Sequence, residues 1–163
     1  MKRILKLLLR AICTFFAKRK IQSYGRDLKV SFPCKFTSKT KVGDNCSFNG
    51  IKIMGDGNVI IGDNFHSGKE CMIITNNHNY EGERLPYDDT YIVRDVTIDE
   101  NVWIGNRVLI LGGAHIGEGA IIQAGSVVVG DIPALSIAGG HPAKPFKKRN
   151  EDHYYRLKAE GKY

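Results

Sequence analysis

The sequence lacks the cysteine spacing of a metal ribbon and the long apolar run of a membrane span. Its four cysteines lie 21, 12 and 25 residues apart, without a CxxC pair, which argues against a zinc ribbon or a redox motif. A chain of 163 residues can build one core without disulfide bonds, so we expect reduced thiols and a cytoplasmic protein. Its apolar runs are well short of the roughly 20 residues that cross a bilayer.

Acidic residues are missing from positions 1–26, which hold eight basic residues. The other 137 residues carry 16 basic and 17 acidic side chains, so the net charge of +7 does not predict a nucleic-acid partner. Within residues 1–26, leucines, isoleucines and phenylalanines alternate with Lys and Arg, a pattern that predicts an amphipathic helix. Residues 1–24 could lie peripherally on an anionic inner-membrane surface, or cover one end of the domain or a neighbouring subunit. A cleaved signal peptide fits less well, because Arg10 interrupts its apolar segment.

An aliphatic residue recurs at every sixth position from residue 98 onward. The positions are Ile98, Ile104, Ile110, Ile116, Ile122 and Val128. A period of six is a multiple of two and is not a helical period, so it predicts short strands broken by regular turns. Three such strands close a coil of about 18 residues, and stacked coils form a parallel β-helix with an aliphatic core.

The period of six divides the chain into three parts. Residues 1–26 form the basic segment, and residues 27–145 form the β-helix domain. The repeat stops over residues 76–95, which are rich in Asp, Glu and Tyr and predict a loop extending from the coil. Residues 146–163 predict a short charged helix that caps the last coil.

The run VTIDENVWIGNRVLILGGAHIGEGAIIQAGSVVVGDIP, followed by IAGGHPAK, resembles the carboxyl-terminal half of hexapeptide-repeat acetyltransferases. That family includes galactoside, maltose, streptogramin and capsule or exopolysaccharide acetyltransferases, and the resemblance covers about residues 42–149. It implies an all-β, left-handed β-helix, a homotrimer with active sites between subunits, acetyl-CoA as donor and no metal in catalysis. The handedness comes from the resemblance, since right-handed crossovers are the rule elsewhere.

The resemblance places a catalytic histidine at His78, within the stretch Thr75–Tyr80. Imidazole titrates near neutrality, so such a side chain can take a hydroxyl proton as the oxygen attacks a thioester and then protonate the departing thiolate. The group that orients the ring stays open between a backbone carbonyl, Glu81, Asp88 and Asp89. Candidate acceptor contacts are His66, Asn77, Tyr80, Arg84, Tyr87 and Asp88.

The resemblance also implies a coenzyme-binding set, in which Gly and Ala permit close approach of the pantetheine arm and lysines meet the phosphates. The set is Trp103, Asn106, Ala124, Gly125, Val129, Gly130, Gly139, Gly140, Lys144 and Lys147.

These features predict an acetyl-CoA-dependent O-acetyltransferase that acts on a sugar hydroxyl in surface-glycan or polysaccharide synthesis. The nearest alternative is N-acetylation of an amino sugar, or acetylation of an antibiotic. A γ-type carbonic anhydrase needs a closely spaced histidine pair, whereas His66 and His78 are twelve residues apart. A non-catalytic β-helix scaffold is the remaining alternative.

Overall fold

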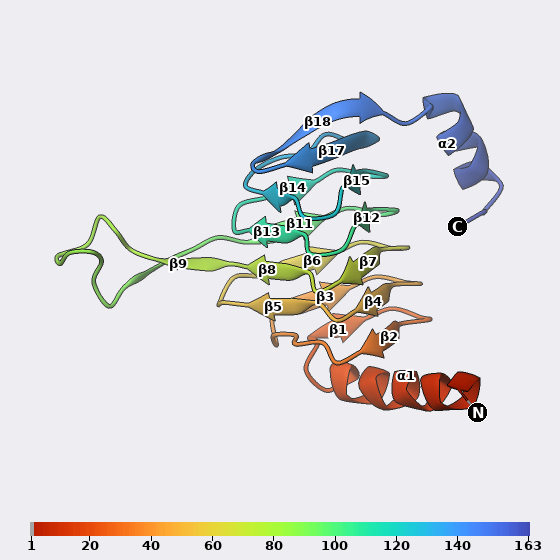
Figure 1. Cartoon of the computed structure of the whole chain (residues 1–163), viewed down its shortest axis with the longest axis horizontal. Coiled ribbons are helices and arrows are strands. Elements are labelled where there is room, and N and C mark those ends of the chain that lie inside the picture. The colour runs from red at the N-terminus through yellow and green to blue at the C-terminus, as the bar shows by residue number, and fades with distance from the viewer. Residues whose placement is uncertain (1) are drawn as a thin grey trace.

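The computed structural model describes residues 2–163, and its central part is a parallel β-helix (Figure 1). The chain winds into about six three-sided coils, whose corresponding sides pair as parallel strands. Helix α1 (Lys2–Lys18) lies across the N-terminal end of the coil, and helix α2 (Glu151–Ala159) lies beside the coil near the other end. The predicted coil, with one helix near each end of the chain, is confirmed.

The described strands form three flats, which are the sides of the coil, and one hairpin. In spatial order, flat 1 holds β1 (Ser23–Tyr24), β3 (Thr40–Val42), β6 (Val59–Ile61), β11 (Val96–Ile98) and β14 (His115–Ile116). Flat 2 holds β2 (Lys29–Phe32), β4 (Ser47–Asn49), β7 (His66–Lys69), β12 (Trp103–Ile104), β15 (Ile121–Ile122), β17 (Ser136–Gly140) and β18 (Ala143–Lys148). Flat 3 holds β5 (Lys52–Met54), β8 (Met72–Ile74), β13 (Leu109–Leu111) and β16 (Val127–Val128). The hairpin pairs β9 (Asn76–His78) with β10 (Tyr91–Val93).

The core consists of aliphatic side chains stacked in register from coil to coil. On flat 3, Ile53, Ile73, Ile110 and Val128 follow one another in the parallel ladder, and each is fully buried. Flat 1 repeats the arrangement with Ile61, Ile98 and Ile116. Because side chains alternate along a strand, inward residues fill the prism while their neighbours face outward. Strands β5, β8 and β13 of flat 3 each bury one residue, whereas β6 of flat 1 buries Val59 and Ile61 on either side of exposed Ile60.

The corners between flats 1 and 2 are held by a ladder of asparagines. Asn45, Asn64 and Asn101 have φ values of 52°, 58° and 60°, a left-handed conformation that Asn tolerates better than most residues. The side-chain amide of Asn45 donates to Asn64 at 3.0 Å, and that of Asn64 donates to Asn101 at 2.9 Å. The turn signals Gly-Asp-Asn in the sequence therefore mark a hydrogen-bonded column that fixes one edge of the prism.

Helix α1 covers the N-terminal end of the coil. Ala17 is buried, Cys13 packs against the core, and Thr14 Oγ1 accepts a hydrogen bond from Val30 N at 3.0 Å. That bond satisfies an edge amide of the first coil, which begins at Ser23, slightly before the predicted boundary at residue 27. No helix among the described residues combines the length and the apolar composition that crossing a bilayer requires.

The C-terminal cap differs from the predicted one. Strand β18 folds back antiparallel to β17 and covers the last edge of flat 2, so residues 143–148 are extended and the helix begins only at Glu151. Helix α2 instead lies against the side of the coil, where Tyr154 is buried. The edge of β17 needs a hydrogen-bonding partner, and a strand supplies one where a helix cannot.

The segment predicted as a loop at 76–95 is a hairpin that projects sideways from the coil (Figure 1). At its base, Arg94 N donates to Thr75 O at 2.8 Å, and Thr75 Oγ1 accepts from Gly57 N at 3.0 Å in the coil below. These bonds hold the two ends of the insertion together, so that the coil continues past it in register.

The stacked core predicts a large difference between inward and outward isoleucines. Ile110→Ala should lower the free energy of unfolding by about 2–5 kcal/mol, because it leaves a cavity between Ile73 and Val128. Ile60→Ala, at a position 44% exposed in β6, should cost less than about 1 kcal/mol. Urea unfolding followed by circular dichroism measures both, and equal losses would contradict the account of the core.

Candidate active site

His78 stands at the end of β9 on the projecting hairpin, where its side chain is exposed. The contacts of its ring are aromatic. Tyr87 stacks on it with ring centroids 3.8 Å apart and planes inclined by 15°, and Tyr91, its partner across the ladder, lies 4.7 Å away. Two tyrosines therefore restrict the orientation of an imidazole that otherwise faces solvent.

Two of the three carboxylates considered as partners of His78, Asp88 and Asp89, are engaged elsewhere in the hairpin. Asp88 accepts hydrogen bonds from the hydroxyl and the amide of Thr90 and from Glu83 N, and these bonds hold the pKa of Asp88 below its usual range. Asp89 pairs with Arg84. Arg84 and Asp88, predicted as acceptor contacts, thus have structural partners within the tip, and Tyr87 contacts the histidine itself.

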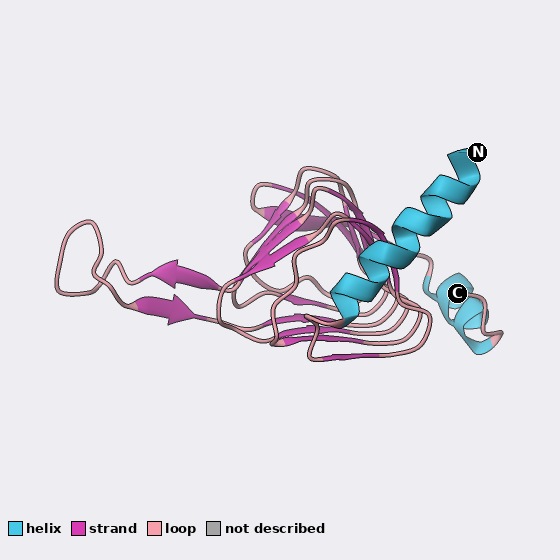
Figure 2. Ribbon diagram, turned by 90° about the horizontal axis from the view of Figure 1, so that it is seen from below, coloured by secondary structure: helices cyan, strands magenta, loops and turns pink. Residues whose placement is uncertain are grey.

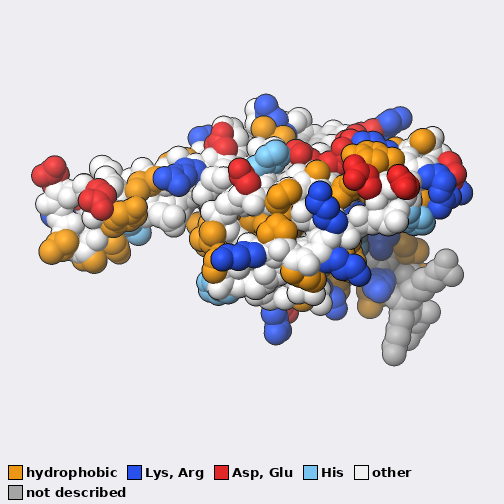
Figure 3. Space-filling view, turned by 90° about the horizontal axis from the view of Figure 1, so that it is seen from above, with side chains coloured by type: hydrophobic (Ala, Val, Ile, Leu, Met, Phe, Trp, Pro, Cys, Tyr) orange, Lys and Arg blue, Asp and Glu red, His pale blue; other side chains and the backbone are white. Residues whose placement is uncertain are grey.

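A small cavity lies on the hairpin side of the coil. Its volume is about 100 Å³, and its lining comprises Thr75, Asn77, Tyr80, Ile92, Arg94 and Gly112. Asn77 and Tyr80, two of the predicted acceptor contacts, both line this cavity, while Arg94 and Gly112 were not singled out in the sequence. Beyond this cavity, acidic side chains gather toward the outer end of the hairpin (Figure 3).

A second cleft lies at the corner between flats 2 and 3. Its volume is about 430 Å³, and it is lined by Lys69, Glu70, Asn106, Arg107, Ala124 and Gly125. Asn106, Ala124 and Gly125 belong to the predicted coenzyme set. Gly125 has φ 74° with open space where a Cβ would stand, so its backbone conformation, rather than close packing, favours glycine.

Two cations of this cleft were missed in the sequence. Arg107 is 2.7 Å from Glu70, and its guanidinium lowers the pKa of that carboxyl. Lys69 lies over the ring of Phe32, 5.3 Å from the centroid, and among the described residues no carboxylate pairs with it. Lys69 is the last residue of β7, and Arg107 lies two residues before β13. Their proximity could be recognised only once the two coils were aligned.

The remaining predicted residues lie around the coil. His66 and Trp103 are neighbours on the outer face of flat 2, and Trp103 is 52% exposed. Val129 and Gly130 follow β16 at the corner between flats 3 and 1, with Val129 52% exposed. The last four, in the β17–β18 hairpin, are Gly139, Gly140, Lys144 and Lys147.

One chain does not bring His78 and the coenzyme cleft together. The hairpin leaves the coil after Ile74, whereas the cleft lies at the other end of β8 beside Glu70. At about 3.3 Å per residue, roughly 15 Å of flat 3 separates the cleft from the base of the hairpin, which carries His78 still farther out. The predicted acceptor and coenzyme residues therefore form two groups at different corners.

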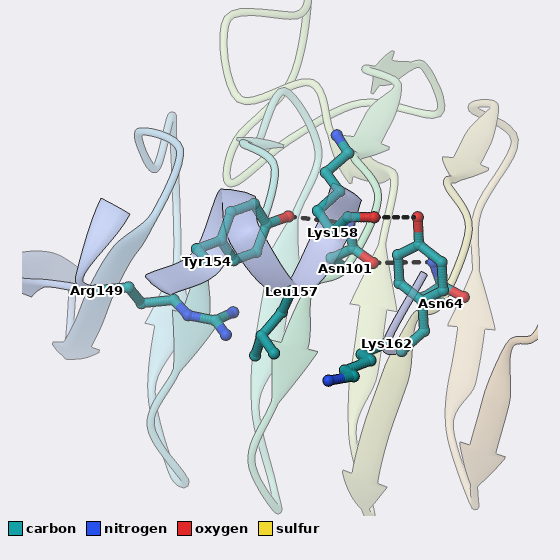
Figure 4. Close-up of a pocket in the computed structure, with 8 residues that line it drawn as sticks. Asn64, Asn101, Arg149, Tyr154, Leu157, Lys158 and Lys162 are labelled. Atoms are coloured by element: carbon teal, nitrogen blue, oxygen red, sulfur yellow. Dashed lines mark hydrogen bonds between the residues drawn. The ribbon is translucent and has the colours of Figure 1, made fainter. Parts of the chain in front are cut away.

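A further cavity, of about 210 Å³, lies where α2 meets the coil (Figure 4). Tyr154 continues the asparagine ladder, because its hydroxyl accepts from Asn101 and donates to Glu118, both at 2.9 Å. Lys158 Nζ bridges Glu100 at 2.8 Å and Glu118 at 2.6 Å. Sequence reasoning missed this group, which attaches α2 to the side of the coil.

The pKa values of this group reflect its mutual hydrogen bonds. Burial, together with the bond to Glu118, raises the pKa of Tyr154 to about 12. Burial acts to raise the pKa of Glu118, but the bonds from Lys158 and Tyr154 outweigh it and lower the value. The two glutamates raise the pKa of Lys158. At neutral pH the cluster thus holds charged Lys and Glu beside a neutral tyrosine.

Comparison with known proteins supports the assignment of the repeat. A family model described as bacterial transferase hexapeptide (six repeats) matches residues 95–130. Galactoside O-acetyltransferase of Escherichia coli K12 is 33% identical over 144 residues, covering 85% of this chain and 70% of that protein. An acetyltransferase homologue of Saccharomyces cerevisiae, YJL218W, is 40% identical over 125 residues, 76% of this chain. The chain spans only 63% of YJL218W and 54% of the Schizosaccharomyces pombe homologue C18B11.09c.

Solved structures share the fold across most of the chain. The hexapeptide-repeat acetyltransferase VCA0836 of Vibrio cholerae, complexed with acetyl coenzyme A, is 25% identical with a TM-score of 0.76, covering 90% of this chain and 84% of that one. Galactoside acetyltransferase in complex with coenzyme A is 28% identical with a TM-score of 0.73, covering 84% of this chain and 70% of that one. The predicted left-handed β-helix is confirmed.

The attachment of α2 predicts unequal roles for two adjacent tyrosines. Tyr154→Phe should lower the free energy of unfolding by about 1–2 kcal/mol, because it leaves the side-chain amide of Asn101 without its acceptor and removes one of the two hydrogen bonds to a Glu118 oxygen, which keeps Lys158. Tyr155→Phe, at a position 46% exposed, is the matched control and should change it by less than about 0.5 kcal/mol. Thermal unfolding compares them, and an unchanged Tyr154→Phe protein would refute the ladder's extension into α2.

Proposed function

The chain belongs to the hexapeptide-repeat acetyltransferase family, and on that premise we propose that it is an acetyl-CoA-dependent O-acetyltransferase with His78 as general base. The observation that carries the proposal is the likeness to galactoside O-acetyltransferase, which extends over 85% of the chain and includes the hairpin as well as the repeats. The exposed imidazole on that hairpin supplies a base outside the packed coil.

In the proposed reaction, His78 takes the proton of an acceptor hydroxyl while the hydroxyl oxygen attacks the thioester carbonyl. The new C–O bond forms, the C–S bond breaks, and the proton passes from His78 to the departing thiolate sulfur. Tyr87 and Tyr91 hold the ring during both transfers, since their ring centroids lie 3.8 and 4.7 Å from that of the imidazole. Restricting a base in this way lowers the entropic cost of reaching the reactive geometry.

The corner cleft is the proposed site of the coenzyme. Asn106, Ala124 and Gly125 offer backbone and amide groups, and Lys69 adds a cation for a phosphate. Lys144 and Lys147, exposed on β18, are further cations near the same end of the coil. The residues on this surface carry the charge that a polyanionic coenzyme requires.

Because His78 is remote from the cleft of its own chain, we propose that the site is completed by a second copy in a homotrimer. The exposed ring of Trp103 and the exposed Val129 support such a contact, since large apolar side chains on an outer face are usually covered. The hairpin of one copy would then reach the cleft of its neighbour.

The proposed acceptor is a sugar hydroxyl of a surface glycan or polysaccharide precursor, and the proposed setting is cytoplasmic. All four cysteines are free thiols, as a reducing compartment favours. N-acetylation of an amino sugar would use the same base, and acceptor chemistry separates the two: an O-acetyl ester is cleaved by mild alkali, whereas an amide is not.

His78→Ala should lower kcat/KM for acetyl transfer about 10²-fold or more, because the hydroxyl then has no positioned base. Acetyl-CoA affinity, measured by calorimetry, should stay within about twofold of the unmodified protein, since the proposed role of the histidine is to deprotonate the acceptor hydroxyl and not to hold the coenzyme. The matched control is His153→Ala on α2, which should keep full turnover.

The assay uses release of the coenzyme thiol against galactosides, other glycans and amino sugars. Full turnover by His78→Ala would refute the role of the histidine. Absence of acetyl-CoA binding to the unmodified chain would refute the proposed function as a whole.

A further inference from the structure

Helix α1 presents an apolar face to solvent. Eight of its large side chains are between 39% and 72% exposed: Ile4, Leu5, Leu7, Leu8, Leu9, Ile12, Phe15 and Phe16. At 100° per residue, seven of them fall within an arc of about 140° on one side of the helix, from Ile4 to Leu9 in angular order, and Leu7 lies beside that arc. So continuous an exposed apolar surface is unusual and marks a contact with something else.

The opposite face of α1 is the one that contacts the coil. Cys13, Thr14 and Ala17 lie on it, and half-buried Arg10 shares that side. The helix is therefore seated by its small and polar face and turns its apolar face away from the protein. Its N-terminal half extends past the outline of the coil, with no other element beside it (Figure 2).

Positive charge is concentrated at this same end of the molecule. Residues 1–43, which include α1 and strands β1, β2 and β3, hold 12 of the 24 basic residues and one of the 17 acidic ones. The remaining 120 residues thus carry 12 basic and 16 acidic side chains. Exposed cations around the base of α1 include Lys18, Arg19, Lys20, Lys29, Lys35, Lys39 and Lys41.

We propose that this end of the molecule docks on an anionic lipid surface, with the apolar face of α1 inserted at the level of the headgroups. An apolar face bordered by cations matches both layers of such a surface, the acyl boundary and the phosphates above it. Residues 1–43 carry a net charge that attracts anionic lipid.

A second copy of this chain fits the face less well than lipid does. Two α1 helices meeting through their apolar faces would bring together two strongly basic ends, with one acidic residue each to offset the repulsion. The N-terminal half of α1, which extends past the coil, would also need an apolar surface on the second copy to pack against. A bilayer provides an apolar surface along the whole length of the helix.

In this arrangement the coil stands on the bilayer by its first turn. Strand β18 lies at the far end of the stack, and the hairpin leaves sideways from the third coil, about 10 Å above the first at two strand spacings. Substitutions in β18 should therefore leave lipid binding intact, which provides a control at the opposite end of the same molecule.

The test is co-sedimentation of the full chain with vesicles of phosphatidylglycerol and phosphatidylcholine. The protein should bind the mixed vesicles, bind pure phosphatidylcholine much less, and dissociate as salt is raised to screen the cations. Phe16→Glu should weaken binding to the mixed vesicles about tenfold or more, because it places a charge in the apolar face.

Phe146→Glu is the matched control, since Phe146 is 59% exposed against 61% for Phe16 and the charge change is the same. It should bind vesicles like the unmodified chain. Circular dichroism confirms that both variants fold.

Three results would overturn the proposal. In the first, the unmodified chain does not bind the mixed vesicles. In the second, the Phe16→Glu and unmodified proteins bind them equally. In the third, the unmodified chain forms an oligomer but does not bind vesicles, and Phe16→Glu loses that oligomer. The last, read by light scattering, would assign the face to a second copy. Lipid binding is measured without acetyl-CoA or acceptor, so its outcome is independent of the proposed enzymatic function.

Discussion

The stacking of inward aliphatic side chains from coil to coil sets the positions of the corners, clefts and insertions of this protein. Ile73 lies between Ile53 and Ile110 on flat 3, and Ile98 lies between Ile61 and Ile116 on flat 1, all with their side chains buried. Because a parallel ladder admits one register, each coil is placed about 4.8 Å above the previous one. Corners, clefts and insertions then recur at fixed positions along three edges.

The edges of the prism have different tasks. The asparagine column at the corner between flats 1 and 2 is structural, and Tyr154 extends it to attach α2. The corner between flats 2 and 3 forms the cleft beside Asn106, and the corner between flats 3 and 1 carries the hairpin with His78. A rigid stack with variable corners is a scaffold on which chemistry can be placed without disturbing the core.

The period of six predicted the coil and its inward residues, because six consecutive positions from Ile98 to Val128 obey one spacing. It also predicted the departure of the chain after Thr75. It did not predict that the insertion pairs as a strand hairpin, since residues 76–93 share no period with the coil. The place of α2 could not be read from residues 146–163, because it depends on Tyr154 meeting Asn101, 53 residues earlier in the chain. The candidate site was likewise predicted only in part. The motif indicated His78, whereas the contact of His78 with Tyr87 depends on how the outer part of the hairpin folds.

The separation of His78 from the cleft leads to the central claim, that the site lies between copies. Mixing two inactive proteins tests it most directly: His78→Ala, which lacks the base, and Ala124→Trp, which fills the cleft. If the trimer is assembled from equal amounts of both, about a quarter of the contacts join an intact hairpin to an intact cleft, so about a quarter of the normal activity should return. No recovery in verified mixed trimers would contradict a site shared between chains.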